Sequence, residues 1–116
     1  MIKIEVIVRP ERVNVVIDAM AEAGCTGFTY QNVTGRGTQE GIEVFTGRGG
    51  VSHRVAVPKV CITSVTEKSK QKKVVDSIIS AAKSGDEGQI GDGKIFISEI
   101  SDVIRVRTGD SGNKAL

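Results

Sequence analysis

The chain has 116 residues, the size of one ordinary domain. Apolar residues make up 39% and charged residues 26%, which excludes a disordered, collagen-like or coiled-coil chain. The formal net charge is only +2 and aromatic residues are 3%, so neither phosphate attraction nor base stacking favours a nucleic-acid binder.

The chain opens with a predicted strand that ends at Pro10. Its apolar side chains alternate with mostly polar ones, which is the period of a strand with one better-buried face: Ile2, Ile4, Val6 and Val8. A helix is predicted over residues 11–23, where apolar side chains recur at helical spacing, and Gly24 ends it. Residues 25–34 are rich in β-branched and aromatic side chains, so they predict a second strand.

The next segment, from Gly35 to Pro58, shows no strand or helix period and is rich in glycine. A segment this long without predicted structure in a small domain is usually functional, and we expect a long mobile loop over residues 36–57. A strand follows around residues 60–65, then a helix over 67–84. A strand around residues 95–97 and a short last strand over 103–107 complete the prediction. We expect the second helix to bury Val75, Ile78, Ile79 and Ala82.

This order of elements predicts one α+β domain with a ferredoxin-like βαββαβ fold, in which two helices cover one face of an antiparallel four-stranded sheet. The long loop lies between the second and third strands. The other face of the sheet also carries apolar side chains, such as Ile7 and Val65. We therefore expect copies of the chain to cover that face in a homo-oligomer.

Several classes of site are disfavoured by the sequence. Cys25 and Cys61 lack the spacing of a zinc site, and we expect both to be small buried apolar residues. His53 is the only histidine and has no nucleophile and carboxylate in an interpretable arrangement around it, so we expect no enzyme activity. No apolar run is long enough to span a bilayer and no signal peptide is found, which predicts a cytoplasmic protein without membrane insertion.

The glycine-rich turn over residues 85–94 resembles a phosphate-binding loop only in part. Gly88 to Lys94 fits GxxxxGK, but Ile95 replaces the residue that ligates Mg²⁺, and a strand follows where a helix is required. A Walker-type NTPase is excluded. An amide-rich turn ending in Lys94 remains, together with Arg105 and Arg107 on one face of the predicted last strand. These cations suit a polyphosphate; the alternative is a solvated turn with two surface arginines.

Four motifs together resemble a known family. They are GRGTQEG at residues 35–41, PKV at 58–60, IGDGKIF at 90–96 and VIRVRTG at 103–109. This set strongly resembles the PII family of signal-transduction proteins over nearly the whole chain. The resemblance implies one PII-like domain over residues 1–116 that forms a homotrimer, with a phosphate-binding turn at 85–94 and a C-terminal segment at 103–116.

The resemblance also implies ATP or ADP bound in clefts between subunits. The nucleotide-binding residues would be Ile7, Gly27, Thr29, Gly35, Arg36, Gly37, Thr38, Gln39, Ser64, Gly91, Asp92, Gly93, Lys94, Arg105 and Arg107. In members that sense 2-oxoglutarate, the residue matching Gln39 ligates Mg²⁺ with the ATP phosphates. The oxo acid would be bound by Arg9, Gln39, Gly41 and Lys59.

The long loop would dock on a target protein and change conformation with the ligand. Its expected docking residues are Arg48, Val51, Ser52, His53 and Arg54. Family targets include an ammonium transporter, nitrogenase and glutamine synthetase, and the sequence does not choose among them. The loop tip has no tyrosine, so the uridylylation used by some bacterial members is not expected there.

This chain departs from the common family pattern at several positions. Thr38 and Glu40 stand where many members have Arg and Lys, which removes two cations and adds an anion near the expected metal and oxo acid. Thr63 stands where many members have Glu. Relative to the family pattern, Asp86 to Gly88 resembles an insertion of three residues ahead of the phosphate-binding turn. Two alternatives stay open: a PII-like sensor of another small molecule outside nitrogen control, and a slow ATP hydrolase.

Overall fold

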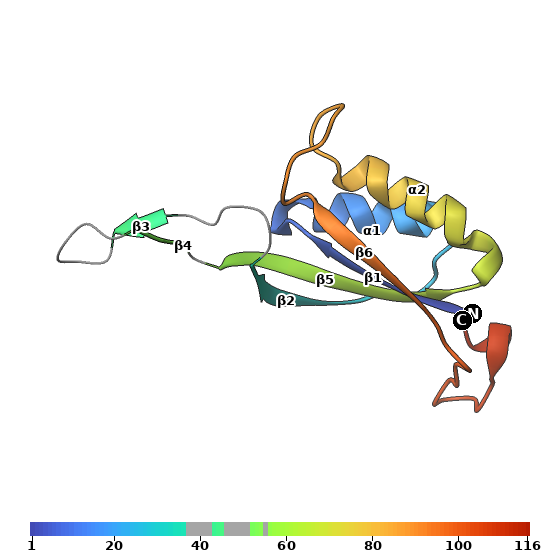
Figure 1. Ribbon diagram of the computed structural model, residues 1–116. Coiled ribbons are helices and arrows are strands. Elements are labelled where there is room, and N and C mark those ends of the chain that lie inside the picture. Colours follow the sequence, from blue (N-terminus) through green and yellow to red (C-terminus); the bar gives the residue numbers. More distant parts are fainter. Residues whose placement is uncertain (37–42, 46–51, 55) are drawn as a thin grey trace.

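The computed structural model describes residues 1–36, 43–45, 52–54 and 56–116. A four-stranded sheet runs through it, and both helices pack on the same face of that sheet (Figure 1). The strands are β1 (Ile2–Val8), β2 (Thr29–Gly35), β3 (Glu43–Phe45), β4 (Ser52–Arg54), β5 (Val57–Thr66) and β6 (Gly93–Glu99), and the helices are α1 (Val13–Glu22) and α2 (Gln71–Ala82). Short 3₁₀ helices lie at Pro10–Arg12, Lys68–Lys70 and Gly112–Ala115.

The strand order in the sheet is β2-β5-β1-β6, with every neighbouring pair antiparallel. This topology confirms the predicted ferredoxin-like βαββαβ fold. The β3 and β4 strands pair only with each other, within the segment that joins β2 to β5. Apart from β3, β4, Arg36, Ala56 and Val57, the predicted loop over 36–57 lies outside the described residues.

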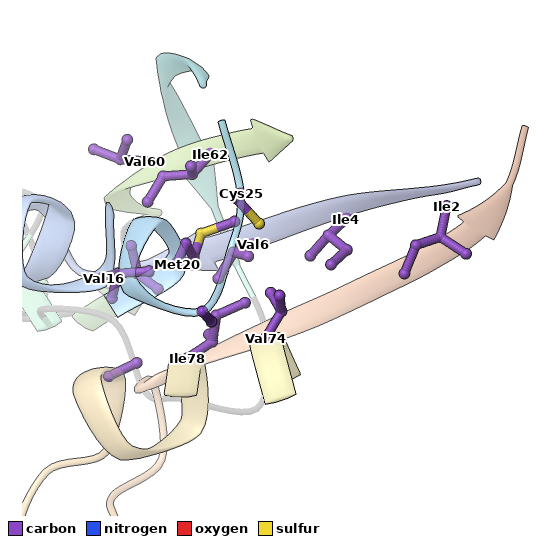
Figure 2. Close-up of a cluster of buried hydrophobic side chains, with 13 residues drawn as sticks. Ile2, Ile4, Val6, Val16, Met20, Cys25, Val60, Ile62, Val74 and Ile78 are labelled. Carbon is purple, nitrogen blue, oxygen red and sulfur yellow. The ribbon is translucent and has the colours of Figure 1, made fainter. Parts of the chain in front are cut away.

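The core lies between the sheet and the two helices. Every second residue of β1 is buried, from Ile2 to Val8, as the alternating pattern predicts. Val16 and Met20 of α1 and Ile78 of α2 pack against this row in one apolar cluster (Figure 2). Cys25 is also buried in the cluster, which agrees with its expected role as a small apolar residue.

The sheet face opposite the helices has a mixed character. The register places Ile7 beside Cys61 and Lys94, and Glu5 beside Thr63 and Phe96. Phe96 keeps 52% of its surface exposed there. The predicted apolar side chains on this face are therefore present, and no helix of the described chain covers them.

Two predicted strands differ from those observed. The strand predicted to begin at residue 25 begins at Thr29, because the Cys25 N–H closes the end of α1 by donating to the Met20 carbonyl oxygen at 3.0 Å. The strand predicted over 103–107 is wrong. There the chain forms a turn, in which the Arg105 N–H donates to the Asp110 carbonyl oxygen, with one isolated bridge between Ile104 and Ser111.

The helices also differ in detail from the prediction. The first begins with a 3₁₀ turn at Pro10 and becomes α-helical at Val13. The second buries Val74 in place of Val75, and its Ile79 remains 49% exposed. Both Val74 and Val75 are apolar, so the spacing alone does not decide which one faces the core.

Candidate functional site

A cavity of about 410 Å³ lies on the helix-free side of the sheet, at the start of β6. Strands β1, β2 and β5 contribute to its wall, and the turn before β6 closes one side. The predicted site residues that line it are Ile7, Gly35, Arg36, Lys59, Gly91, Asp92, Gly93 and Lys94. The structure thus brings together most of the predicted nucleotide-binding residues from β1, β2 and the turn.

The turn over residues 84–92 is organised around the Asp92 carboxylate. One oxygen accepts hydrogen bonds from the backbone N–H groups of Ser84 and Gln89, each at 2.8 Å. The other accepts from the Ser84 hydroxyl at 2.6 Å and lies 3.5 Å from Nε of Arg9. The hydrogen bonds from Ser84, then that from Gln89, hold the pKa of Asp92 well below its usual range, so this group is an anion.

Two cations bind the backbone carbonyl groups of the same turn. Lys59 donates from Nζ to the Gly91 carbonyl oxygen at 2.6 Å, and Arg9 donates to the Ile90 carbonyl oxygen at 3.1 Å. Burial lowers the pKa of Lys59, and the neighbouring Arg9 charge lowers it further. Arg36 and Lys94 add two exposed cations on the cavity wall. Among the described lining residues, Asp92 is the one carboxylate, so the cavity favours an anionic ligand.

Gly93 allows the start of β6, directly after the turn, to lie very close to the backbone of β1. A Cβ atom at this position would lie 2.0 Å from the Ile7 carbonyl oxygen, and the backbone has a φ of +138°. Only glycine tolerates both conditions without a backbone shift. The close approach of β6 to β1 at the cavity edge therefore requires the glycine of the GDGK motif.

The other predicted nucleotide residues that the structure describes do not line this cavity. Ser64 donates from its hydroxyl to the Gly27 carbonyl oxygen at 2.6 Å, on the part of β5 that pairs with Ile4. Lys94 pairs with Ile7, which is three residues further along β1 than Ile4, or about 10 Å of strand. Because side chains alternate along a strand, Ser64 and Lys94 also lie on opposite faces of the sheet. Arg105 contacts Asp110 at 3.8 Å and the Leu116 carbonyl oxygen at 3.4 Å.

The C-terminal segment that carries Arg105 and Arg107 lies at the far end of β6 from the turn (Figure 1). The prediction that the two arginines share one face of a last strand is wrong, since no strand forms there. The expected site therefore separates into two groups. The turn group consists of the residues at the cavity, and the distal group consists of Gly27, Thr29, Ser64, Arg105 and Arg107.

Some predicted residues lie outside the described chain. These are Gly37, Thr38, Gln39, Gly41, Arg48 and Val51, so the expected Mg²⁺ ligand and part of the 2-oxoglutarate site are among them. Ser52, His53 and Arg54 form β4, which pairs with Glu43–Phe45. Within the described ranges, no group of three or more His, Cys, Asp or Glu side chains is arranged to hold a metal ion. No described helix is both long and apolar enough to cross a membrane.

Ser84 and Gln89 were not predicted as site residues, although both bind Asp92. Ser84 has a sequence signal, since a serine before a glycine-rich turn commonly bonds to the turn. Gln89 acts through its backbone, and any residue but proline offers the same N–H. Val57 and Phe96 also line the cavity, and only the strand register places them there.

Comparison with known proteins agrees with this fold. Residues 1–110 match the model of the family described as nitrogen regulatory protein P-II. Nitrogen regulatory protein P-II 2 of Methanothermobacter thermautotrophicus is 44% identical over 116 residues, which cover 98% of this chain and 96% of that relative. The P-II homolog of Arabidopsis thaliana is 42% identical over 97% of this chain, which spans 56% of that longer relative.

A solved structure gives the same result for the fold. The crystal structure of Arabidopsis thaliana PII bound to citrate superposes with a TM-score of 0.77 and 38% sequence identity. The match covers 99% of this chain and 91% of the crystallised one. Because residues 1–110 match the family model and a relative is 44% identical over nearly the full length of both chains, the chain belongs to the nitrogen regulatory protein P-II family.

Proposed function

We propose that this protein is a signalling protein of nitrogen metabolism that binds ATP or ADP at the cavity beside the turn. One observation carries the proposal: Arg36, Lys59 and Lys94 line the same cavity as the glycine-rich turn of the GDGK motif. Cations and accessible backbone around one cavity suit the phosphates of a nucleotide. The protein acts through binding and conformational change and has no catalytic role.

The nucleotide site is completed by a second copy of the chain. The turn group and the distal group lie at different ends of the sheet, so one chain does not surround a nucleotide with both. The helix-free face carries the partly exposed Ile7 and the half-exposed Phe96, which a second copy would cover. We therefore propose a homotrimer, with each site formed by the turn group of one subunit and the distal group of its neighbour.

A second, carboxylate-bearing effector also belongs to the proposal. Arg9 and Lys59 are cations beside the cavity, and the resemblance to the PII family implies them in binding 2-oxoglutarate, with Gln39 and Gly41. The related Arabidopsis structure is described as bound to citrate, which supports a small polycarboxylate as a ligand in this family. Gln39 would hold Mg²⁺ against the ATP phosphates, and the ion would neutralise their charge.

The output of the protein is a contact between its long loop and a target of nitrogen metabolism. Arg48, Val51, Ser52, His53 and Arg54 are the proposed docking residues, and the candidate targets are an ammonium transporter, nitrogenase and glutamine synthetase. The protein is expected to work in the cytoplasm, where it meets adenine nucleotides. A bound ligand that repositions the loop would change its fit to the target.

Titration calorimetry with ATP and ADP tests nucleotide binding. We expect Lys94→Glu to weaken ATP binding by at least roughly tenfold, since it replaces a cation at the cavity with an anion. Lys72→Glu is the matched control, because this exposed lysine of α2 pairs with Asp76 and does not line the cavity. Failure of the unmodified protein to bind either nucleotide would reject the proposal.

The same titrations separate the two alternatives. The change from the common Arg and Lys to Thr38 and Glu40 favours a sensor of another small molecule. That alternative is supported if 2-oxoglutarate leaves the ATP affinity unchanged while another metabolite alters it. Release of ADP from ATP over hours with Mg²⁺ would support slow hydrolysis.

A further inference from the structure

The Asp92 side chain is the most heavily bonded group of the site. Its two oxygens take three hydrogen bonds of 2.6 to 2.8 Å and an ion pair to Arg9 at 3.5 Å. The side chain is only 16% exposed. All of these donors come from the protein itself: Ser84 at the start of the turn, Gln89 within it, and Arg9 directly after β1. The carboxylate therefore closes the turn on itself and fastens it to the sheet.

This arrangement does not suit Asp92 as a direct ligand of a phosphate. A carboxylate repels a phosphate group, and its acceptor oxygens offer no hydrogen to a phosphate oxygen. The family motif nevertheless places this anion between two glycines at the cavity. Its contacts point to a role in shaping the turn, with Arg9 compensating its charge.

The turn needs such support because of its composition. Gly85, Gly88 and Gly91 all adopt positive φ angles of 67° to 97°, and each glycine loses more backbone freedom on ordering than other residues. If the turn became ordered only when a ligand bound, that loss would be subtracted from the binding free energy. A turn already fixed in the free protein avoids the loss.

We infer that Asp92, Ser84 and Arg9 are positioning residues, which form a clamp that presets the turn before a nucleotide arrives. Ser84 and Asp92 join the two ends of the turn, and Arg9 ties both Asp92 and the Ile90 carbonyl oxygen to the end of β1. The inference rests on the proposed function, because it gives the clamp the role of holding phosphate-binding backbone in place.

The variant Asp92→Asn tests the clamp, because a role in charge and a role in shaping the turn predict opposite changes in ATP affinity. If Asp92 acted only through its charge, its neutralisation would strengthen the binding of an anion. Asparagine has one acceptor oxygen, so its NH₂ group would face either Arg9 or the two backbone N–H groups of Ser84 and Gln89. The clamp therefore predicts that Asp92→Asn weakens ATP binding by roughly tenfold or more.

The control is Asp86→Asn, which removes the same charge from an exposed position of the same turn. We expect it to leave ATP affinity unchanged or slightly raised. Ser84→Ala removes one hydrogen bond to Asp92 and should weaken binding, whereas Ser84→Thr keeps the hydroxyl and should restore it. An Asp92→Asn protein that stays folded and binds ATP as tightly as the unmodified protein, or more tightly, overturns the inference.

Hydrogen exchange in the ligand-free trimer or monomer provides a second measurement that needs no nucleotide. The Ser84 and Gln89 amides should exchange at least roughly tenfold faster in Asp92→Asn than in the unmodified protein, and Asp86→Asn should leave them unchanged. Unchanged exchange in Asp92→Asn overturns the clamp. If the unmodified protein does not bind ATP, the proposed function is rejected. The exchange rates of the Ser84 and Gln89 amides would still show whether the clamp orders the turn.

Discussion

At the scale of single residues, Lys59 links the cavity to proton binding. It is buried to 8% exposure against the Gly91 carbonyl oxygen, and burial followed by repulsion from Arg9 lowers its pKa. A polyanion bound beside Lys59 would stabilise the charged amine and raise that pKa again. Binding therefore takes up protons at pH values between the lowered and the restored pKa.

This coupling predicts that ATP binding is accompanied by proton uptake at pH values where free Lys59 is partly deprotonated, and that the uptake fades as the pH falls below the lowered pKa. Titration calorimetry in two buffers of different ionisation enthalpy measures the uptake. Lys59→Arg should remove it, because arginine keeps its charge throughout this range. Equal proton uptake in the unmodified protein and Lys59→Arg would show that another group is responsible.

Residue types revealed part of the site before the fold was known. The GDGK motif, which ends in Lys94, indicates a phosphate-binding turn from composition and spacing alone, and the structure places it at one cavity. Composition and spacing could not indicate that Asp92 shapes the turn, because its place in the GDGK motif suggests a residue that binds the nucleotide directly. Its actual partners, Ser84 and Arg9, are 8 and 83 residues away in the chain and meet it only through the turn and the sheet.

At the scale of elements, the joint between the turn and β6 depends on Gly93. Gly93→Ala would place a Cβ atom 2.0 Å from the Ile7 carbonyl oxygen at a φ of +138°, so the backbone of β1 or β6 must move. We expect a loss of about 2 kcal/mol or more in the free energy of unfolding. Urea denaturation measures this loss.

Gly27→Ala is the matched control for stability, because nothing lies within 4 Å of the Cβ that it would add. It should change the free energy of unfolding by less than about 1 kcal/mol. If both variants lose the same stability, the close approach of β6 to β1 is not what requires glycine at position 93.

The spacing of apolar side chains predicts correctly the strands and helices that pack against the core. It predicts wrongly where local backbone contacts determine the conformation. The alternation of β1 is confirmed because one face of the strand packs against two helices. Residues 103–107 alternate in the same way, yet the chain turns back through Gly109 and Gly112, whose φ angles are 71° and 67°. The period describes side chains, whereas a strand also needs a partner for its backbone.

At the scale of the whole molecule, the fold separates the family motifs into two groups. The turn group lies at the start of β6, whereas the distal group lies at the start of β2, on β5 and beyond the other end of β6. The sequence contains the residues of both groups, but it does not show how far apart they lie in the folded chain. Their separation in one chain, together with the uncovered apolar face, is what supports a site shared between copies.

Subunit complementation tests this shared site most directly. Lys94→Glu damages the turn group and Arg105→Glu damages the distal group, so each pure variant should bind ATP poorly. When equal amounts of the two variants are unfolded together and refolded, random assortment should make about a quarter of the sites from an intact turn group and an intact distal group. This fraction of sites is expected to bind ATP with the affinity of the unmodified protein. A mixed assembly that regains no tight site would contradict the shared site.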